Sequence, residues 1–541
     1  MEEYLGRASS IMGKISILLP LILFLAVPLS AQVNRYAVFF ADKDGSPYSI
    51  AQPEEFLSAR AILRRQNQNI TIQENDLPVN PLYIAGLLDA GANVFYTSRW
   101  FNMALVQMEE GLESDILTLQ FVSEVRQIAP GERLSPTGRK RSSWLGRLQG
   151  RTTNSQINQL GLNNLHDEGF LGSDVFIAVF DSGFEGVDTS EAFSAIIDED
   201  RLTDTFNFVL NSQEVYSLDS HGTEVLSVMG ASVQDEFVGA SPRASFALYL
   251  SEDDDSEYPI EEFNWLMAAE RADSVGVDII NSSLGYNTFL APFDDYALED
   301  MDGNTTVVTR AADLAASKGM LVVTSAGNEG NNDWGTITAP ADADSVISVG
   351  SVNSSGFLSS SSSGGPTTDG RIKPEVVARG VSTSVIRSSG NIGTASGTSF
   401  SAPLVAGMAA CIWESQPSLT AMQLRDTIIS ISSNFQNPNN QFGYGIPQFG
   451  EIIASLEGAK VAGLTVFPNP TTSNTVTISG IKYRNPKFIL VDMSGKKYVL
   501  NTISEVEKGS YDVSLCKFSG GTYIIDVYLG NRSQKIKIFE R

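Results

Sequence analysis

The sequence predicts an α/β fold with a doubly wound, mostly parallel sheet at its centre and a smaller unit on each side. Residues 155–458 alternate strand-like apolar runs with helix-like segments, which places helices on both faces of a parallel sheet. Residues 32–130 mix strands and helices on a smaller scale and predict a small α/β domain. Residues 459–541 hold short strands between turn residues and predict a small β-sandwich.

Residues 1–31 predict a signal peptide. Lys14 precedes the apolar run 15–27, and small residues ending at Ala31 offer a cleavage site. Charged residues before Met12 are unlike a normal n-region, so a translation start at Met12 is an alternative. No later apolar run approaches the length that spans a bilayer, so we expect a secreted or cell-surface protein without a transmembrane segment in the mature chain.

The N-terminal unit, residues 32–130, shows no catalytic constellation of residues. Its expected strands and helices follow in chain order. We predict strands at 36–40, 93–96 and 103–108, and helices at 56–65, 81–88 and 114–125.

Residues 131–154 predict an exposed linker, because glycine and proline alternate there with basic residues. Such a segment is open to proteases, so maturation is expected to cut within it, although the sequence does not fix the bond. Its basic residues are Arg133, Arg139, Lys140, Arg141, Arg147 and Arg151.

The central unit, residues 155–458, supplies strands that end on polar residues. Open α/β sheets bind ligands at the carboxyl ends of their strands, so functional residues are expected there. We predict strands at 175–180, 244–250, 277–280, 321–324 and 346–349, and helices at 225–230, 260–274, 307–317 and 404–412.

The C-terminal unit, residues 459–541, is rich in short strands. Two or more sheets of such strands packed face to face would make the β-sandwich. We predict strands at 464–467, 475–478, 488–491, 521–527 and 535–539.

Charge is unevenly distributed within the net charge of −26. Residues 152–455 hold 10 Lys and Arg against 41 Asp and Glu, whereas residues 463–541 hold 11 against 6. The acidic central unit makes nucleic acid a poor partner. The run 252–257 could ligate structural Ca²⁺, but it lacks the spaced ligands and glycine of an EF-hand, so a solvated loop is expected instead.

Two cysteines, Cys411 and Cys516, lie in different units. A disulfide between them would have to cross those units, so two buried free thiols are expected.

Three short motifs supply an acid, a base and a nucleophile in chain order. They are Asp181 in Val-Phe-Asp-Ser-Gly, His221 in Ser-His-Gly-Thr, and Ser399 in Gly-Thr-Ser-Phe-Ser-Ala-Pro. A serine needs an imidazole to take its proton and a carboxylate to orient that imidazole. The chain has two histidines, and His166 reads as a structural residue near a helix end, so His221 is the expected base.

These motifs and their order resemble the subtilisin-like (subtilase) serine peptidases, and the Asp-His-Ser order differs from chymotrypsin and the α/β-hydrolases. The resemblance covers nearly all of the central unit and implies the subtilisin-like fold. By position, the N-terminal unit is similar to the propeptide of secreted subtilases, with a permanent accessory domain as the alternative. Motifs of the C-terminal unit, such as Val466-Phe467-Pro468-Asn469-Pro470, resemble the type A sorting domain of the Bacteroidetes type IX (Por) secretion system; the alternative is a carbohydrate- or protein-binding module.

The resemblance also implies an oxyanion hole and a peptide-binding edge. The backbone N–H of Ser399 and the side chain of Asn328, in Ser-Ala-Gly-Asn-Glu-Gly, would donate to the oxyanion. The expected substrate-binding residues are Ser283, Leu284, Gly285 and Gly327, with Tyr286 and Thr338 as weaker candidates for specificity pockets. Arg379 and Phe400 depart from the family pattern, where Pro and Met are usual. We expect these departures to affect the rim of the site and its packing and to leave the three catalytic candidates intact.

We therefore expect a secreted serine endopeptidase, made as a zymogen and exported through the periplasm. Its expected partners are protein or peptide substrates, its own propeptide and the type IX secretion machinery. The chemistry requires no cofactor and no metal. The alternatives are a catalytically silent surface-binding protein on a subtilase scaffold, or an esterase using the same triad; the missing Gly-x-Ser-x-Gly elbow counts against a lipase-type enzyme.

Overall fold

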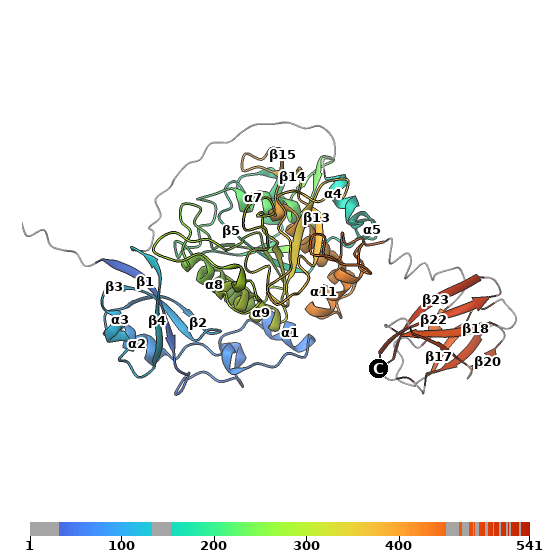
Figure 1. Cartoon of the computed structure of the whole chain (residues 1–541), viewed down its shortest axis with the longest axis horizontal. Coiled ribbons are helices and arrows are strands. Elements are labelled where there is room, and N and C mark those ends of the chain that lie inside the picture. Colours follow the sequence, from blue (N-terminus) through green and yellow to red (C-terminus); the bar gives the residue numbers. More distant parts are fainter. Residues whose placement is uncertain are drawn as a thin grey trace, which may run out of the picture.

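The computed structural model describes residues 32–132, residues 153–450 and, between 465 and 540, the strands with a few adjoining residues (Figure 1). We refer to these as the N-terminal, central and C-terminal units. The predicted signal peptide and residues 133–152 of the predicted linker lie outside the described residues. Among the described helices, none combines the length and the apolar character that a membrane span requires.

The central unit is built on a seven-stranded sheet in which every neighbouring pair is parallel. The chain fills one side of β5 with β9 and β6 before it crosses to β10 on the other side, so the switch point of the sheet lies between β5 and β10. In spatial order the strands are β13 (Val376–Arg379), β12 (Ile347–Val352), β11 (Leu321–Ser325), β10 (Ile279–Ser282), β5 (Phe176–Asp181), β9 (Ser245–Leu250) and β6 (Leu202–Asn207).

Helices cover both faces of this sheet, as the alternating pattern predicts. Ile177 and Val179 of β5 face a core that includes α7 (His221–Gly230) and α10 (Ala402–Ser415). Ala178 and Phe180 face the opposite core, with α8 (Ile260–Val275) and α9 (Val307–Ser317). Successive side chains of a strand point to opposite faces, so one buried strand serves two cores.

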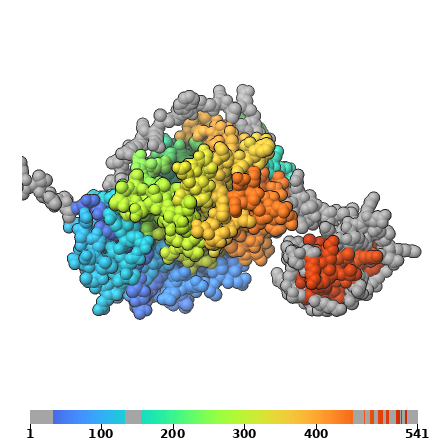
Figure 2. Space-filling model, viewed as in Figure 1, coloured from blue at the N-terminus to red at the C-terminus, as the bar shows by residue number. Residues whose placement is uncertain are grey.

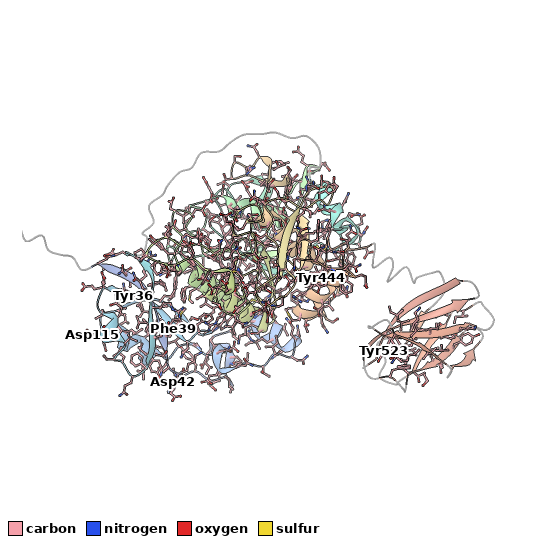
Figure 3. The ribbon with its side chains drawn as sticks, in the orientation of Figure 1. Tyr36, Phe39, Asp42, Asp115, Tyr444 and Tyr523 are labelled. Carbon is pink, nitrogen blue, oxygen red and sulfur yellow. The ribbon has the colours of Figure 1, made fainter. Side chains whose placement is uncertain are left out.

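The N-terminal unit is a four-stranded antiparallel sheet in the order β2 (Asn93–Ser98), β3 (Met103–Glu109), β1 (Val33–Phe40), β4 (Val122–Pro130). Tyr36 and Phe39, both labelled on β1 in Figure 3, belong to opposite faces of this sheet. One face packs against α2 (Pro81–Asp89) and the short helix α3 (Glu113–Ile116).

The helix predicted over residues 114–125 is wrong for most of its length, because α3 ends at Ile116 and β4 begins at Val122. Val122 and Val125 pair with Phe40 and Val38 of β1, a partner more than eighty residues away in sequence. The apolar spacing of this segment fits a helix as well as a strand, and tertiary pairing decides between them.

The second face of the N-terminal sheet packs on the central unit, and the two units share one core. Trp100, Met103 and Leu105 lie in the same cluster as Phe263 of α8 and Val308 of α9. Figure 2 shows the N-terminal unit, in blue and cyan, against the green and yellow-green surface of the central unit. A further helix of the N-terminal unit, α1 (Ala59–Asn67), also contacts α8.

The C-terminal unit holds two antiparallel four-stranded sheets around one core, which confirms the predicted β-sandwich. Val476 and Val513 come from one sheet, and Leu490, Tyr523 and Ile525 from the other; Tyr523 is labelled in Figure 3. The first sheet contains β16 (Thr465–Phe467), β17 (Thr475–Ser479), β21 (Ser510–Ser514) and β20 (Ile503–Glu507), and the second contains β19 (Lys497–Val499), β18 (Lys487–Asp492), β22 (Gly521–Leu529) and β23 (Arg532–Glu540).

The remaining elements are short and surround the central sheet. They are α4 (Asn154–Gln159), α5 (Leu162–Asp167), α6 (Ser194–Asp198), α11 (Ala421–Ser430), and the strand pairs β7 (Ser232–Val233) with β8 (Phe237–Val238) and β14 (Thr383–Ile386) with β15 (Ile392–Ala395).

Candidate active site

Asp181 and His221 meet at the carboxyl end of β5, beside the switch point. Asp181 is the last residue of the strand and is fully buried, and His221 is the first residue of α7. The Nδ1 atom of His221 lies 2.7 Å from Oδ1 of Asp181, and the backbone N–H of Ser182 donates to the same oxygen at 2.9 Å. The carboxylate therefore fixes the imidazole ring through Nδ1 and leaves Nε2 to face a substrate.

The charge of Asp181 controls the titration of His221. Burial favours the neutral ring, but the adjacent carboxylate and its hydrogen bond outweigh burial and raise the pKa of His221 to about 9. About a third of the His221 side chain remains exposed, so proton exchange with solvent is open.

Ser399 lies in a single 3-10 turn, Thr398–Phe400, that leads into α10. The turn follows Gly397, whose φ of 147° is one that side chains rarely allow. The Ser399 hydroxyl donates to the carbonyl oxygen of Ser283 at 3.3 Å, and the Ser283 hydroxyl donates to the carbonyl oxygen of Ser399 at 2.9 Å. These two bonds hold the serine against the segment that follows β10.

Ser399 and His221 line one cavity of about 300 Å³. Phe400, which departs from the family pattern, lies with its ring centroid 5.6 Å from that of His221. In this structure the Ser399 hydroxyl donates to the carbonyl oxygen of Ser283. The Ser399 side chain must therefore rotate before its hydroxyl proton can pass to His221. The structure thus brings the three predicted residues to one site.

Asn328 follows β11 and is exposed beside the serine turn. Its Oδ1 accepts hydrogen bonds from the backbone N–H of Thr398 at 2.9 Å and from the Thr398 hydroxyl at 3.1 Å. Both bonds use the oxygen end of the amide, so the NH₂ end is the one oriented to donate. This orientation fits the predicted oxyanion donor, with the Ser399 N–H as its expected partner.

The predicted peptide-binding edge, Ser283, Leu284 and Gly285, lines the same cavity. A Cβ atom on Gly285 would lie 2.2 Å from Oγ1 of Thr338, and one on Gly327 would lie 2.9 Å from it. Thr338 therefore packs behind both glycines, and its buried hydroxyl has no hydrogen-bond partner. Tyr286 is also buried. Its backbone N–H donates to the carbonyl oxygen of Ala339, and the N–H of Ala339 donates to the carbonyl oxygen of Tyr286.

The acidic run 252–257 is only partly the solvated loop that we predicted. Asp254 and Asp255 are exposed, but Glu252 is buried and accepts a hydrogen bond from the Tyr286 hydroxyl. The hydroxyl lies 34 residues further along the chain, so the sequence offered no local signal of this contact. Among the described residues no group of three or more His, Cys, Asp or Glu side chains is arranged to hold a metal ion.

The second histidine and the described cysteine have structural contacts outside this site. Nε2 of His166 lies 2.9 Å from the carbonyl oxygen of Ala240, in agreement with its structural interpretation. Cys411 is a buried free thiol, and burial raises its pKa well above the usual range. Cys516 lies outside the described residues.

Arg379, the other departure from the family pattern, ends β13 at the rim of the sheet. Its guanidinium donates to the carbonyl oxygen of Ser382 at 2.8 Å and to the hydroxyl of Ser155. At this position, where the family usually has proline, Arg379 connects the rim of the sheet to Ser155 near the start of the central unit.

Three family models match successive parts of the chain. The model described as the subtilase family matches residues 172–445. The Peptidase S8 propeptide domain of Bacteroidota matches residues 35–143, and the secretion system C-terminal sorting domain matches residues 465–539. The predicted propeptide and sorting domain thus have independent support, and the sorting domain indicates export.

Several curated proteins are similar to the central part of the chain. Subtilisin E of Bacillus subtilis is 33% identical over 294 residues, which cover 53% of this chain and 68% of that protein. Subtilisin DY of Bacillus licheniformis is 31% identical over 51% of this chain and 89% of that protein. Serine protease AprX of Bacillus subtilis is 28% identical over 46% of this chain and 60% of that protein.

Proposed function

The chain belongs to the subtilase family of serine peptidases, and we propose that it is a secreted endopeptidase that forms an acyl-enzyme at Ser399. One observation carries this proposal. His221, held by the buried Asp181 at 2.7 Å, lines the same cavity as Ser399, at the switch point of the sheet. The arrangement supplies an oriented base next to a nucleophile on rigid elements.

In the acylation step, Nε2 of His221 takes the hydroxyl proton as Oγ of Ser399 attacks the scissile carbonyl carbon. The new C–O bond converts the carbonyl oxygen to an oxyanion. Asp181 stays ionised, holds Nδ1–H and stabilises the imidazolium that forms. As the tetrahedral intermediate collapses, His221 gives this proton to the amine of the leaving peptide, and the C–N bond breaks.

In the deacylation step, a water molecule replaces the amine. His221 removes one of its protons while the water oxygen attacks the acyl carbon, and the same proton then returns to Oγ of Ser399. The peptide leaves as a carboxylic acid and the enzyme returns to its starting state. All of these steps use protein groups and water.

Asn328 and the Ser283–Gly285 segment provide stabilisation and position. The NH₂ group of Asn328 and the N–H of Ser399 would donate to the oxyanion, which is favoured by donors fixed in advance. An extended peptide would add as a strand beside Ser283, Leu284 and Gly285, with Gly327 opposite. The absence of side chains at both glycines permits close backbone approach.

The flanking units fit a precursor that is exported and then processed. The N-terminal unit would assist folding and restrain the protease, and cleavage in the basic linker 131–154 would separate it from the central unit. Residues 1–31 would direct the chain to the periplasm, and the C-terminal unit would then present it to the type IX secretion machinery for release or surface attachment.

Replacement of the nucleophile tests the proposal. The wild-type chain is expected to cleave casein and to be labelled by a fluorophosphonate probe, whereas Ser399→Ala should lose both properties. Casein cleavage by Ser399→Ala at the wild-type rate would refute the assignment. Absence of labelling in the processed wild-type protein would instead favour a catalytically silent binding protein, and labelling with turnover of esters alone would favour an esterase.

A further inference from the structure

The cavity that holds Ser399 and His221 is lined on one side by carboxylates. We call this lining the acidic wall and define it as Asp219, Glu252, Asp253, Asp254, Glu257 and Glu261. Among the residues that line this cavity, His221 is the single basic group, and no Lys or Arg is present. Six carboxylates in one cavity with His221 as their one basic neighbour are costly, since like charges disfavour one another and burial disfavours the charge of the buried members.

We propose that the acidic wall binds a Lys or Arg side chain of the substrate, so that the enzyme selects peptides with a basic residue near the scissile bond. The inference rests on the proposed peptidase function and adds its substrate class. The peptide-binding edge Ser283–Gly285 and the acidic wall line the same cavity. Because alternate side chains of an extended peptide share one face, a peptide on this edge would bring side chains of one face into the cavity that the wall lines.

The wall is held in place by contacts within the central unit. Oε1 of Glu252 accepts from the buried hydroxyl of Tyr286, and the Ser256 hydroxyl donates to Oε1 of Glu261 at 3.2 Å. Asp219 accepts from the Ser182 hydroxyl at 3.2 Å and from the N–H of Ser220 at 2.6 Å. These acceptors are therefore fixed before a ligand arrives, which lowers the entropic cost of binding a cation.

A buried acceptor behind the wall lacks a donor. Asn264 is 3% exposed, and its NH₂ group donates to the carbonyl oxygen of Ser251 at 3.1 Å, but its Oδ1 has no hydrogen-bond partner. Asn264 lines an adjoining cavity of about 210 Å³ together with Asp253 and Glu261 of the wall and with Arg35 of the N-terminal unit. An acceptor left open beside two carboxylates fits a ligand that donates several hydrogen bonds, as guanidinium and ammonium groups do.

The chain itself supplies a ligand with this chemistry. Glu132, the last described residue before the gap at 133–152, lines the adjoining cavity, and the basic residues of the linker follow it directly in sequence. The linker contains six Lys and Arg residues between Arg133 and Arg151. A protease that selects basic residues would thus meet matching segments at the place where its own precursor is expected to be cut.

The raised pKa values of three wall carboxylates agree with a site for a cation, whereas hydrogen bonds and the His221 charge lower the pKa of Asp219 against the effect of burial. Burial raises the pKa of Glu252 to about 7, and burial with the Glu252 charge raises that of Glu257 to about 8. Desolvation and the Asp219 carboxylate raise the pKa of Asp254 to about 7. A bound guanidinium would favour the charged carboxylates and move these values back down.

Peptide cleavage tests the proposal with charge as the single variable. Internally quenched alanine-rich peptides would carry one arginine, or the neutral isostere citrulline, at successive positions before the scissile bond. We expect kcat/KM for the best arginine peptide to exceed that of its citrulline twin by at least about 10-fold. Glu257→Gln and Glu261→Gln should each reduce this ratio several-fold. Glu191→Gln, an exposed carboxylate on the central unit, is the matched control and should keep the wild-type ratio.

Binding to the full-length Ser399→Ala chain separates this proposal from the catalytic one. Fluorescence anisotropy should show tighter binding of the arginine peptide than of the citrulline peptide, and the preference should weaken in Glu261→Gln on the same background. If the Ser399→Ala chain binds the arginine peptide more tightly but the wild-type chain cleaves neither peptide, the peptidase function would be rejected and the cation site supported. Equal cleavage and equal binding of the two peptides would overturn the proposal. Binding of Ca²⁺ alone that depends on Glu261, with an arginine-to-citrulline ratio of one, would overturn it in favour of a metal site.

Discussion

The side chain of Ser283 and that of Ser399 each donate a hydrogen bond to the other residue's backbone carbonyl, at 2.9 and 3.3 Å. This reciprocal pair joins the segment after β10 to the turn before α10, although the residues are 116 positions apart in sequence. The proposed nucleophile and the proposed peptide-binding edge are therefore fixed to each other. A change at the edge should therefore alter the position of the nucleophile.

Replacement of Asn328 is expected to slow the chemical step. Asn328→Ala removes the proposed NH₂ donor to the oxyanion and should reduce kcat by about 10²- to 10³-fold with a small change in KM, because such a donor acts mainly in the transition state. Steady-state kinetics on a neutral peptide measures both constants. Thr398→Val, which removes one of the two bonds that orient the Asn328 amide, should cause a smaller loss.

A loss of affinity with an unchanged kcat in Asn328→Ala would contradict the oxyanion assignment. Fluorophosphonate labelling provides the control for folding, since a correctly folded variant should still be labelled, only more slowly.

The pH dependence of activity is expected to follow His221. The base acts when its ring is neutral, and Asp181 raises the pKa of His221 to about 9 against the opposing effect of burial. Log kcat/KM should therefore rise with pH through the neutral range and level off under alkaline conditions, with an apparent pKa above the 6.5 of a free imidazole. A pH series with an uncharged peptide measures this curve, because such a peptide carries no charge that interacts with the acidic wall.

Asp181→Asn separates the effect of charge from other causes of this curve. Loss of the carboxylate should move the rising limb to lower pH, because burial alone lowers the pKa of the histidine, and should also lower the plateau. A limb that stays in place in Asp181→Asn would mean that another group controls activity.

Substitution of Gly285 by any residue with a side chain is expected to reduce activity, because the new Cβ atom would clash with Thr338. A Cβ atom at position 285 would lie 2.2 Å from Oγ1 of Thr338, so Gly285→Ala should displace the edge and reduce kcat/KM by at least about 10-fold. The double variant Gly285→Ala, Thr338→Ala removes the clashing oxygen and should recover much of the activity. Equal activity of the single and double variants would show that the edge is not limited by this contact.

The elements that the sequence predicts correctly have capping or breaking residues next to them in the sequence. The helix 307–317 was predicted to the residue; its N-cap, Thr306, accepts a hydrogen bond from the N–H of Thr309, and Gly319 follows its end. The segment 114–125 lacks such signals, and its strand depends on pairing with β1 far away in sequence. Local patterns therefore identified capped helices and buried strands, whereas pairing of a half-buried strand depended on tertiary context.

The site shows the same division. Asp181, His221, Asn328 and Ser399 stand in motifs with fixed neighbours, so their positions could be predicted without the structure. The acidic wall could not be predicted in this way, because its members come from two separate loops and α8. Glu252 is buried, and its hydrogen bond from the Tyr286 hydroxyl joins residues that are far apart in sequence. An acidic run in sequence does not reveal which of its carboxylates face a cleft.

The N-terminal unit is expected to depend on one buried carboxylate for its hold on the central unit. Asp273 of α8 is fully buried and forms ion pairs with Arg64, Arg65 and Arg99, all from the N-terminal unit. Burial opposes the charge, but the three guanidinium groups outweigh it and hold the pKa of Asp273 well below its usual range. A depressed carboxyl pKa adds stability that is present above the unfolded-state pKa and is lost only as pH falls through the folded-state value, so the contact should persist at neutral pH.

Asp273→Asn should weaken this contact by about 3–5 kcal/mol, because Arg64 would lose its charged partner and Arg65 and Arg99 would keep only Asp76 and Glu270. The measurement uses the full-length Ser399→Ala chain, in which limited trypsin treatment cuts the basic linker, followed by size-exclusion chromatography. The N-terminal unit should co-elute with the central unit when Asp273 is intact and separate from it in Asp273→Asn. Glu124→Gln provides the control, since the exposed Glu124–Arg126 pair contributes about 1 kcal/mol or less. Co-elution in Asp273→Asn, at concentrations where the control also co-elutes, would show that the shared apolar core alone holds the two units together.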